Sequence, residues 1–101
     1  MSAPGPRDAV IVSAVRTPVG KGRPARPGKP GGALHGWHPV DLLARTFEAA
    51  LERVGLVPAE LPPDLLDDVL VGCVGQASEQ AVNVARNAAL AAGLPEAVPA
   101  A

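Results

Sequence analysis

The stretch Ala9-Val10-Ile11-Val12-Ser13-Ala14-Val15 decides the fold, because it is apolar at nearly every position and rich in β-branched residues. Branched side chains are stiff and suit an extended, pleated backbone. An apolar run without alternation is typical of a strand covered on both faces, as in a parallel sheet. Pro18 ends this predicted strand, because proline has no N–H to donate to a neighbouring strand.

The rest of the chain alternates helical and extended patterns. Apolar residues recur at three- and four-residue steps over 39–54, which predicts a helix that starts at a proline and ends before a glycine. An apolar run over 69–74 predicts a second strand, an alanine-rich segment over 81–92 a second helix, and 97–101 a third extended piece. The sequence therefore predicts an α/β fold, a β-α-β-α unit with parallel strands. The layered fold is incomplete, because two strands and two helices leave apolar faces without cover.

Composition limits the class of protein. The 101 residues suffice for one small domain, and the net charge of −1 creates no field that attracts nucleic acid or an anionic membrane. A single cysteine excludes a disulfide framework and fits a reducing compartment. There is no signal-peptide pattern and no apolar run of ~20 residues. We expect a cytoplasmic protein with neither nucleic acid nor membrane as a partner.

Two segments are rich in proline and glycine. Residues 1–7 are predicted to be a loose terminus, and 19–36 a long loop without helix or strand. Between Arg16 and Pro30 there are five basic residues and no acidic one: Arg16, Lys21, Arg23, Arg26 and Lys29. The loop is either a solvated basic surface or an attractant for a phosphate-bearing ligand.

This loop also matches a nucleotide-binding pattern, but only formally. Residues 20–25 read G-x-G-x-x-A after a predicted strand. The dinucleotide fingerprint requires a helix to begin directly at that turn, and Pro24 and Pro27 prevent one. A nucleotide site is therefore disfavoured.

The residue types that usually carry catalysis give no site. Cys73 lies in the middle of a predicted apolar strand, with no helix N-terminus or basic partner to stabilise a thiolate, so we interpret it as a buried structural residue. His35 and His38 are three residues apart, but no other ligand joins them at zinc-site spacing, and His38 is placed to cap the first helix. We assign no catalytic, cofactor-binding or metal-binding residue.

Three polar residues share one face of the second predicted helix: Asn83, Arg86 and Asn87. They form either a solvent-facing surface or a set of hydrogen bonds to loops or to another subunit. The sequence alone leaves both alternatives open.

Three motifs resemble the thiolase family, which includes acetyl-CoA acetyltransferases and 3-ketoacyl-CoA thiolases. They are DAVIVSAVRTPVGK over 8–21, DVLVGCVGQ over 68–76 and NVARNAALAAGLP over 83–95. The closing Val98-Pro99-Ala100 is similar to the start of the next strand of that family. The resemblance covers nearly the whole chain in the right order, although the basic segment over 23–30 is longer than is typical of the family.

The resemblance implies an α/β fold of two similar halves and a Claisen condensation or its reverse, a thiolytic cleavage. In the family a cysteine carries the acyl group, a histidine and a second cysteine move protons, and a coenzyme A thioester is the substrate. No tightly bound cofactor is implied. The acylated cysteine follows the Val-Pro-Ala segment, beyond Ala101, so no catalytic residue is carried over. Arg16, Gln76, Asn83 and Arg86 match family positions and are assigned scaffold or subunit-contact roles.

Three hypotheses follow. The leading one is the N-terminal portion of a thiolase-like acyltransferase, residues 1–101 being a fragment of its N-terminal domain that is not competent alone. Its partners would be acyl-CoA and either the remainder of a thiolase chain or further copies. The second is a non-catalytic interaction module or partner subunit, and the third a small nucleotide-binding domain.

Overall fold

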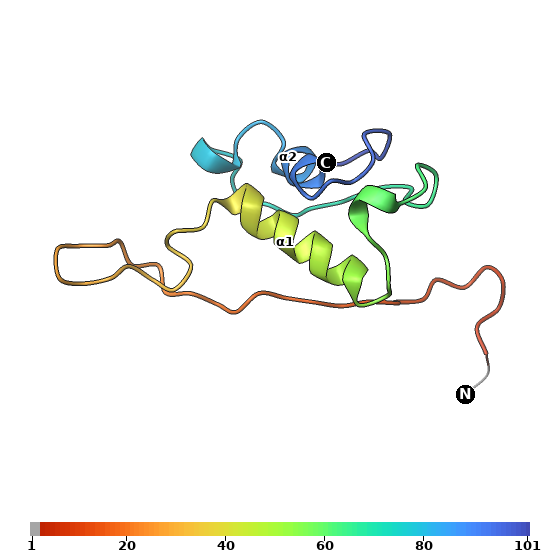
Figure 1. Cartoon of the computed structure of the whole chain (residues 1–101), viewed down its shortest axis with the longest axis horizontal. Helices are drawn as coiled ribbons and strands as arrows, with labels where there is room; N and C mark the ends of the chain where they lie inside the picture. The colour runs from red at the N-terminus through yellow and green to blue at the C-terminus, as the bar shows by residue number, and fades with distance from the viewer. Residues whose placement is uncertain (1–2) are drawn as a thin grey trace.

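The computed structural model describes residues 3–101, so residues 1–2 of the predicted loose terminus lie outside the described part. The elements follow the order α1 (Pro39–Glu52), η1 (Pro58–Glu60), η2 (Ser78–Gln80) and α2 (Val84–Ala91), the two η elements being short 3-10 helices. Figure 1 shows α1 beside α2, and an extended N-terminal segment that runs along α1 and ends in a projecting loop.

Helix α1 begins and ends where its sequence signals predict, to within two residues. His38 caps its first turn, with its Nδ1 accepting a hydrogen bond from the Val40 N–H at 3.2 Å. After Glu52 the chain reverses through Gly55, whose φ is +77°. The Leu56 N–H then donates to the Leu51 carbonyl at 3.0 Å, which closes a Schellman motif and stops the helix before the predicted residue 54.

Helix α2 begins three residues later than predicted. Both Val82 and Asn83 have positive φ angles, +59° and +60°, which a right-handed helix cannot contain. The Asn83 side chain accepts a hydrogen bond from the Arg86 N–H at 3.1 Å and so caps the helix. Its end was predicted correctly, since Gly93 has φ +82° and the Leu94 N–H donates to the Ala89 carbonyl at 3.1 Å.

The core lies between the two helices. The buried cluster consists of Ala44, Leu61, Ala89, Ala92 and Leu94, and Phe47 and Leu51 of α1 pack against it. Alanines occupy the buried face of α2, and Ala88 is fully buried. Small side chains on this face allow α1 to approach closely, as the alanine-rich pattern predicted.

The predicted strand over 9–15 is not formed as a strand. This segment is extended, but no residue in the described range pairs with it as a neighbouring strand. It is held against α1 instead, because the Ser13 hydroxyl donates to the Ala50 carbonyl at 2.8 Å and the Arg53 Nη1 donates to the Ala14 carbonyl at 2.9 Å. A strand requires backbone partners, and here the neighbouring element is a helix.

The predicted second and third extended segments meet in the predicted parallel direction, but only through 99–101. Residues 96–98 form a turn instead, in which the Val98 N–H donates to the Pro95 carbonyl at 3.0 Å. Val69 and Ala100 form an isolated parallel bridge. The Val69 N–H donates to the Pro99 carbonyl at 3.0 Å, and the Ala101 N–H donates to the Val69 carbonyl at 3.0 Å. One bridge is too short to count as a sheet, so the predicted parallel-strand arrangement is present only as this single contact.

Candidate functional site

The densest group of polar contacts surrounds the start of α2, and Arg86 is at its centre. Arg86 Nη1 donates to the Val98 carbonyl at 2.7 Å, and Nη2 donates to the Glu96 carbonyl at 2.9 Å. The planar guanidinium therefore fixes two carbonyls that are two residues apart in the chain. The segment after α2 is held at these two points.

Asparagine side chains extend the same network. Asn83 Nδ2 donates to the Ala100 carbonyl at 3.0 Å, while its oxygen caps α2. Asn87 Nδ2 donates to the Val82 carbonyl at 3.2 Å. The structure shows the hydrogen bonds to loops, and it also leaves Asn83 and Asn87 exposed, so both alternatives left open by the sequence hold in part.

Gln76 ties the network to the preceding extended segment. Its Oε1 accepts a hydrogen bond from the Val84 N–H at 3.3 Å, at the first turn of α2. On the other side of the network, the Val71 N–H donates to the Ala101 carbonyl at 2.9 Å. The segment over 96–101 is thus fixed between 69–71 and α2. We call this group, Gln76, Asn83, Arg86 and Asn87, the α2 polar cluster.

Cys73 is half-buried rather than fully buried, which corrects the interpretation of a core cysteine. Its Sγ lies 3.3 Å from the Gly75 carbonyl and 3.3 Å from Gln80 Oε1. Both neighbours are neutral acceptors, and neither can act as the general base that an activated nucleophile requires. The side chain is partly open because the segment has one bridged neighbour and one uncovered face.

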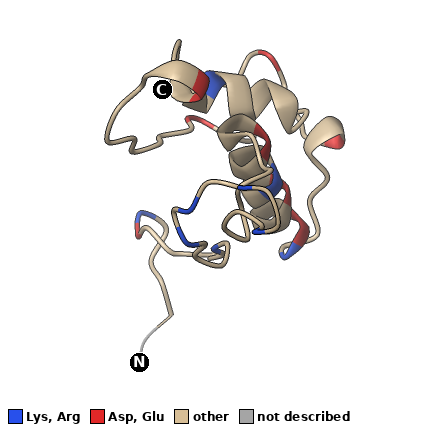
Figure 2. Ribbon diagram, turned by 90° about the vertical axis from the view of Figure 1, so that its left-hand side faces the viewer, with Lys and Arg blue, Asp and Glu red and all other residues tan. Residues whose placement is uncertain are grey.

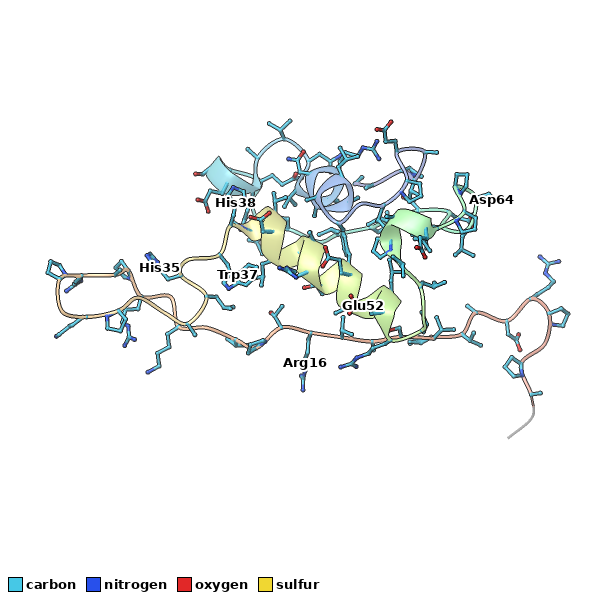
Figure 3. The ribbon with its side chains drawn as sticks, in the orientation of Figure 1. Arg16, His35, Trp37, His38, Glu52 and Asp64 are labelled. Carbon is cyan, nitrogen blue, oxygen red and sulfur yellow. The ribbon has the colours of Figure 1, made fainter. Side chains whose placement is uncertain are left out.

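The two histidines lie at and just before the start of α1. His38 caps α1 as predicted, and His35 is exposed on the loop before it. Within residues 3–101 no group of three or more His, Cys, Asp and Glu side chains lies close enough to hold a metal ion. Figure 3 shows these two side chains with Trp37, all near the start of α1.

Arg16 does not contact the α2 polar cluster. Its side chain is exposed and points away from α1 (Figure 3). With Ala14, Val15 and Arg53 it lines an open hollow of about 410 Å³. The structure therefore brings together three of the four residues that match the family pattern, and leaves Arg16 apart.

Comparison with known proteins identifies the family. Residues 9–101 match the family described as thiolase, N-terminal domain. The chain belongs to the thiolase family. This match supports a thiolase fold for the chain, although residues 3–101 show the two helices without a formed sheet.

Several 3-ketoacyl-CoA thiolases are similar to this thiolase-family chain. A steroid 3-ketoacyl-CoA thiolase of Mycobacterium tuberculosis is 46% identical over 92 residues, which are 91% of this chain and 19% of that protein. A 3-ketoacyl-CoA thiolase of Chromohalobacter salexigens is 43% identical over 96 residues, or 94% of this chain and 21% of that protein. The chain thus spans about a fifth of the length of these relatives.

Some contacts could not be found by reading the sequence. The Ser13 hydroxyl binds a carbonyl 37 residues away in the chain, and the Arg53 guanidinium binds a carbonyl 39 residues away. The one signal was a hydroxyl inside an otherwise apolar run, since a buried hydroxyl must find a hydrogen-bond partner. The positive φ angle of Val82 had no signal at all, because valine is disfavoured there.

None of the helices in residues 3–101 has the length and apolar character needed to cross a membrane.

Proposed function

We propose that this chain is the leading part of an enzyme that transfers acyl groups of coenzyme A thioesters, by Claisen condensation or by thiolytic cleavage. The observation that carries the proposal is the α2 polar cluster, which holds the turn over 96–98 and the segment over 99–101, the latter lying beside 69–71. By resemblance, the family's acylated cysteine follows this segment. The cluster would therefore set the position from which that cysteine enters the active site.

Positioning of this kind matters for covalent catalysis. A nucleophile must meet its substrate in a near-attack geometry, and a misplacement of about 1 Å can cost on the order of 100-fold in rate. Arg86 donates two charge-assisted hydrogen bonds to carbonyls and so restrains the backbone rather than one side chain. The residues of this chain would bind and orient the segment that leads to the nucleophile, and would not themselves attack the substrate.

The chain is proposed to be incompetent alone. In the family, the acylated cysteine and the proton-transferring residues follow the region that this chain matches. The relatives are about five times longer, since the matched part is 19% to 21% of their length. The proposed partner is the remainder of a thiolase chain or further copies, and the proposed location is the cytoplasm.

The substrate class is proposed from the relatives. Their names specify 3-ketoacyl-CoA thiolases, one of them acting on a steroid substrate. We propose a 3-ketoacyl-CoA thioester as the substrate of the complete enzyme, with coenzyme A as the second reactant in the thiolytic direction.

Intact-mass analysis of the protein purified from its own cells tests the proposal first. A species much heavier than 10.2 kDa that contains these residues is expected, followed by thiolysis of a 3-ketoacyl-CoA. A species of 10.2 kDa that neither cleaves the thioester nor joins a second polypeptide that completes it would contradict the proposal.

A second function is favoured by the exposed apolar side chains. Ile11 is 89% exposed and Leu70 is 80% exposed, which is unusual for large aliphatic residues in a folded domain. An interaction module would use this surface to bind a partner protein without catalysis. Isolation of the 10.2 kDa species from its own cells together with whatever it binds separates the two. A stable complex with a second polypeptide that has no thiolytic activity would favour the module, and a complex that cleaves a 3-ketoacyl-CoA would favour the enzyme.

A further inference from the structure

The peptide unit between Ala100 and Ala101 is held at both of its polar ends. Its carbonyl accepts a hydrogen bond from Asn83 Nδ2 at 3.0 Å, and its N–H donates to the Val69 carbonyl at 3.0 Å. Because a peptide unit is planar, bonds at its two ends fix its orientation as well as its position. The orientation of this unit sets the direction of the backbone that follows it.

Asn83 is the member of the α2 polar cluster that acts on this unit. Arg86 binds the carbonyls of Glu96 and Val98, at 2.9 and 2.7 Å, and so restrains the turn that comes before it. The two side chains therefore restrain successive parts of the segment over 96–101, and Asn83 restrains the later part.

Three requirements meet at position 83, and asparagine satisfies all of them. The backbone of Asn83 has φ +60°, a left-handed conformation that glycine, asparagine and aspartate adopt more readily than most residues. Its Oδ1 caps α2 by accepting from the Arg86 N–H at 3.1 Å, while its Nδ2 donates to the Ala100 carbonyl. Glycine offers neither atom, aspartate offers no donor, and serine has a single oxygen for both bonds.

We propose that Asn83 is a positioning residue of the acyl-transfer reaction. It orients the peptide unit that leads to the acylated cysteine and does not itself touch the substrate. This inference rests on the proposed function, which places that cysteine after the segment over 98–100. A nucleophile must approach the thioester carbon from a defined direction, so a small displacement of its backbone lowers the rate. An amide that fixes a peptide plane before the nucleophile therefore acts on the rate through the backbone.

A carboxylate has the shape of the Asn83 amide but lacks its donor. In N83D one carboxylate oxygen can still cap α2, and the other would face the Ala100 carbonyl oxygen, where a donor now lies at 3.0 Å. Two oxygens without a proton between them repel, so the peptide unit should turn away. Figure 2 shows the C-terminus in the upper half of the molecule and the blue segments of the loop over 19–36 in the lower half, so the cations of that loop lie apart from this change.

Three variants of the complete protein, as its cells make it, test the inference. N83D keeps the left-handed preference and the cap but replaces the donor with an acceptor. N83G keeps the backbone conformation and removes the donor without adding a charge that could draw Arg86 from its carbonyls. Q80E is the matched control, because it makes the same change from amide to carboxylate three residues earlier, outside the α2 polar cluster, and keeps the oxygen that accepts from Cys73.

The expected result is a change in rate without a change in stability. Aspartate caps a helix as well as asparagine does, so N83D should melt at the Tm of the unaltered protein. Its kcat for thiolysis of a 3-ketoacyl-CoA should fall roughly ten- to hundredfold, with the KM for the thioester unchanged. N83G should lose less, since nothing repels the carbonyl. Hydrogen exchange, measured by mass spectrometry, should be faster over 98–101 in both variants, and Q80E should match the unaltered protein in every measurement.

An unchanged kcat in both variants of Asn83 would overturn the inference, and so would an equal loss in Q80E. A raised KM with an unchanged kcat would also overturn it, because the side chain would then act on substrate binding. If N83D does not fold, the kcat and KM of N83G decide.

Turnover by the unaltered protein separates this inference from the proposed function. If it cleaves a 3-ketoacyl-CoA, and N83D and N83G cleave it at the same rate, the function stands and the assignment of Asn83 fails. If the unaltered protein cleaves no 3-ketoacyl-CoA, the function fails, and the positioning role fails with it even where hydrogen exchange over 98–101 depends on Asn83.

Discussion

At the scale of single residues, Arg86 illustrates a contact that lysine cannot reproduce. Its two nitrogens reach the carbonyls of Val98 and Glu96 at 2.7 and 2.9 Å, whereas an ammonium is a single point donor. We expect Arg86→Lys to lower the free energy of unfolding by about 1 kcal/mol, because at least one part-exposed hydrogen bond is lost. The Ala101 amide should also exchange hydrogen faster, since its pairing with Val69 is held by this segment.

Urea denaturation and amide hydrogen exchange measure the two effects. Arg45→Lys is the matched control, because Arg45 makes one exposed ion pair of 3.8 Å on α1. Unchanged exchange at Ala101 in the Arg86 variant would show that the guanidinium does not hold this segment.

Val82 is the residue with the least favourable backbone. It has φ +59°, where its branched side chain crowds the backbone, and it is 86% exposed, so its side chain contributes little packing in return. We expect Val82→Gly to stabilise the protein by about 1 kcal/mol, since glycine adopts this conformation without strain. Thermal melting should show a raised Tm. Val84→Gly, at a buried helical position two residues later, should lower it.

At the scale of elements, both helices stop at a glycine with positive φ. Gly55 and Gly93 have φ +77° and +82°, and the N–H after each donates to a carbonyl five residues earlier. We expect Gly55→Ala and Gly93→Ala each to destabilise the protein by about 1 kcal/mol. Gly72→Ala is the control, because its φ is not positive and no atom would lie within 4 Å of the added carbon. A loss of equal size in all three variants, measured in urea, would contradict this assignment.

The helices were predictable because their signals are local. A proline at the start, a capping side chain and a glycine just past the end all lie within a few residues of the boundary, and α1 matches them. The start of α2 was misplaced because Val82 and Asn83 adopt positive φ angles, which the local sequence does not indicate. Strand pairing was the least predictable feature, since a strand is defined by a remote partner that the sequence does not name.

The candidate site could likewise be predicted only in part from the sequence. Spacing placed Asn83, Arg86 and Asn87 on one face of a helix, and the resemblance singled out Gln76 separately. The sequence could not show what these side chains contact, because Arg86 reaches carbonyls 10 and 12 residues away. The hydrogen-bond partners of these side chains required the structure.

At the scale of the whole molecule, the chain is extended for its length. Its radius of gyration is 16.4 Å, compared with about 13 Å for a compact domain of 100 residues. The radius of gyration is larger because the N-terminal segment and the loop over 19–36 reach beyond the helices (Figure 1). Large apolar side chains are exposed on the two extended segments over 9–15 and 69–74. Ile11 is 89% exposed, Val12 73% and Leu70 80%, and Val74 is fully exposed.

An uncovered apolar surface beside unpaired extended backbone predicts self-association of residues 1–101 when they are made alone. We expect the isolated chain to sediment as oligomers and to melt without a sharp transition. L70K/V74K should shift it toward monomer, because charges on exposed positions oppose edge pairing while no buried contact is lost. The control K21Q/R23Q leaves the apolar surface intact and should sediment as the parent does. A monomeric parent with a sharp two-state melt would mean that the two helices and their alanine-lined core are stable without further cover.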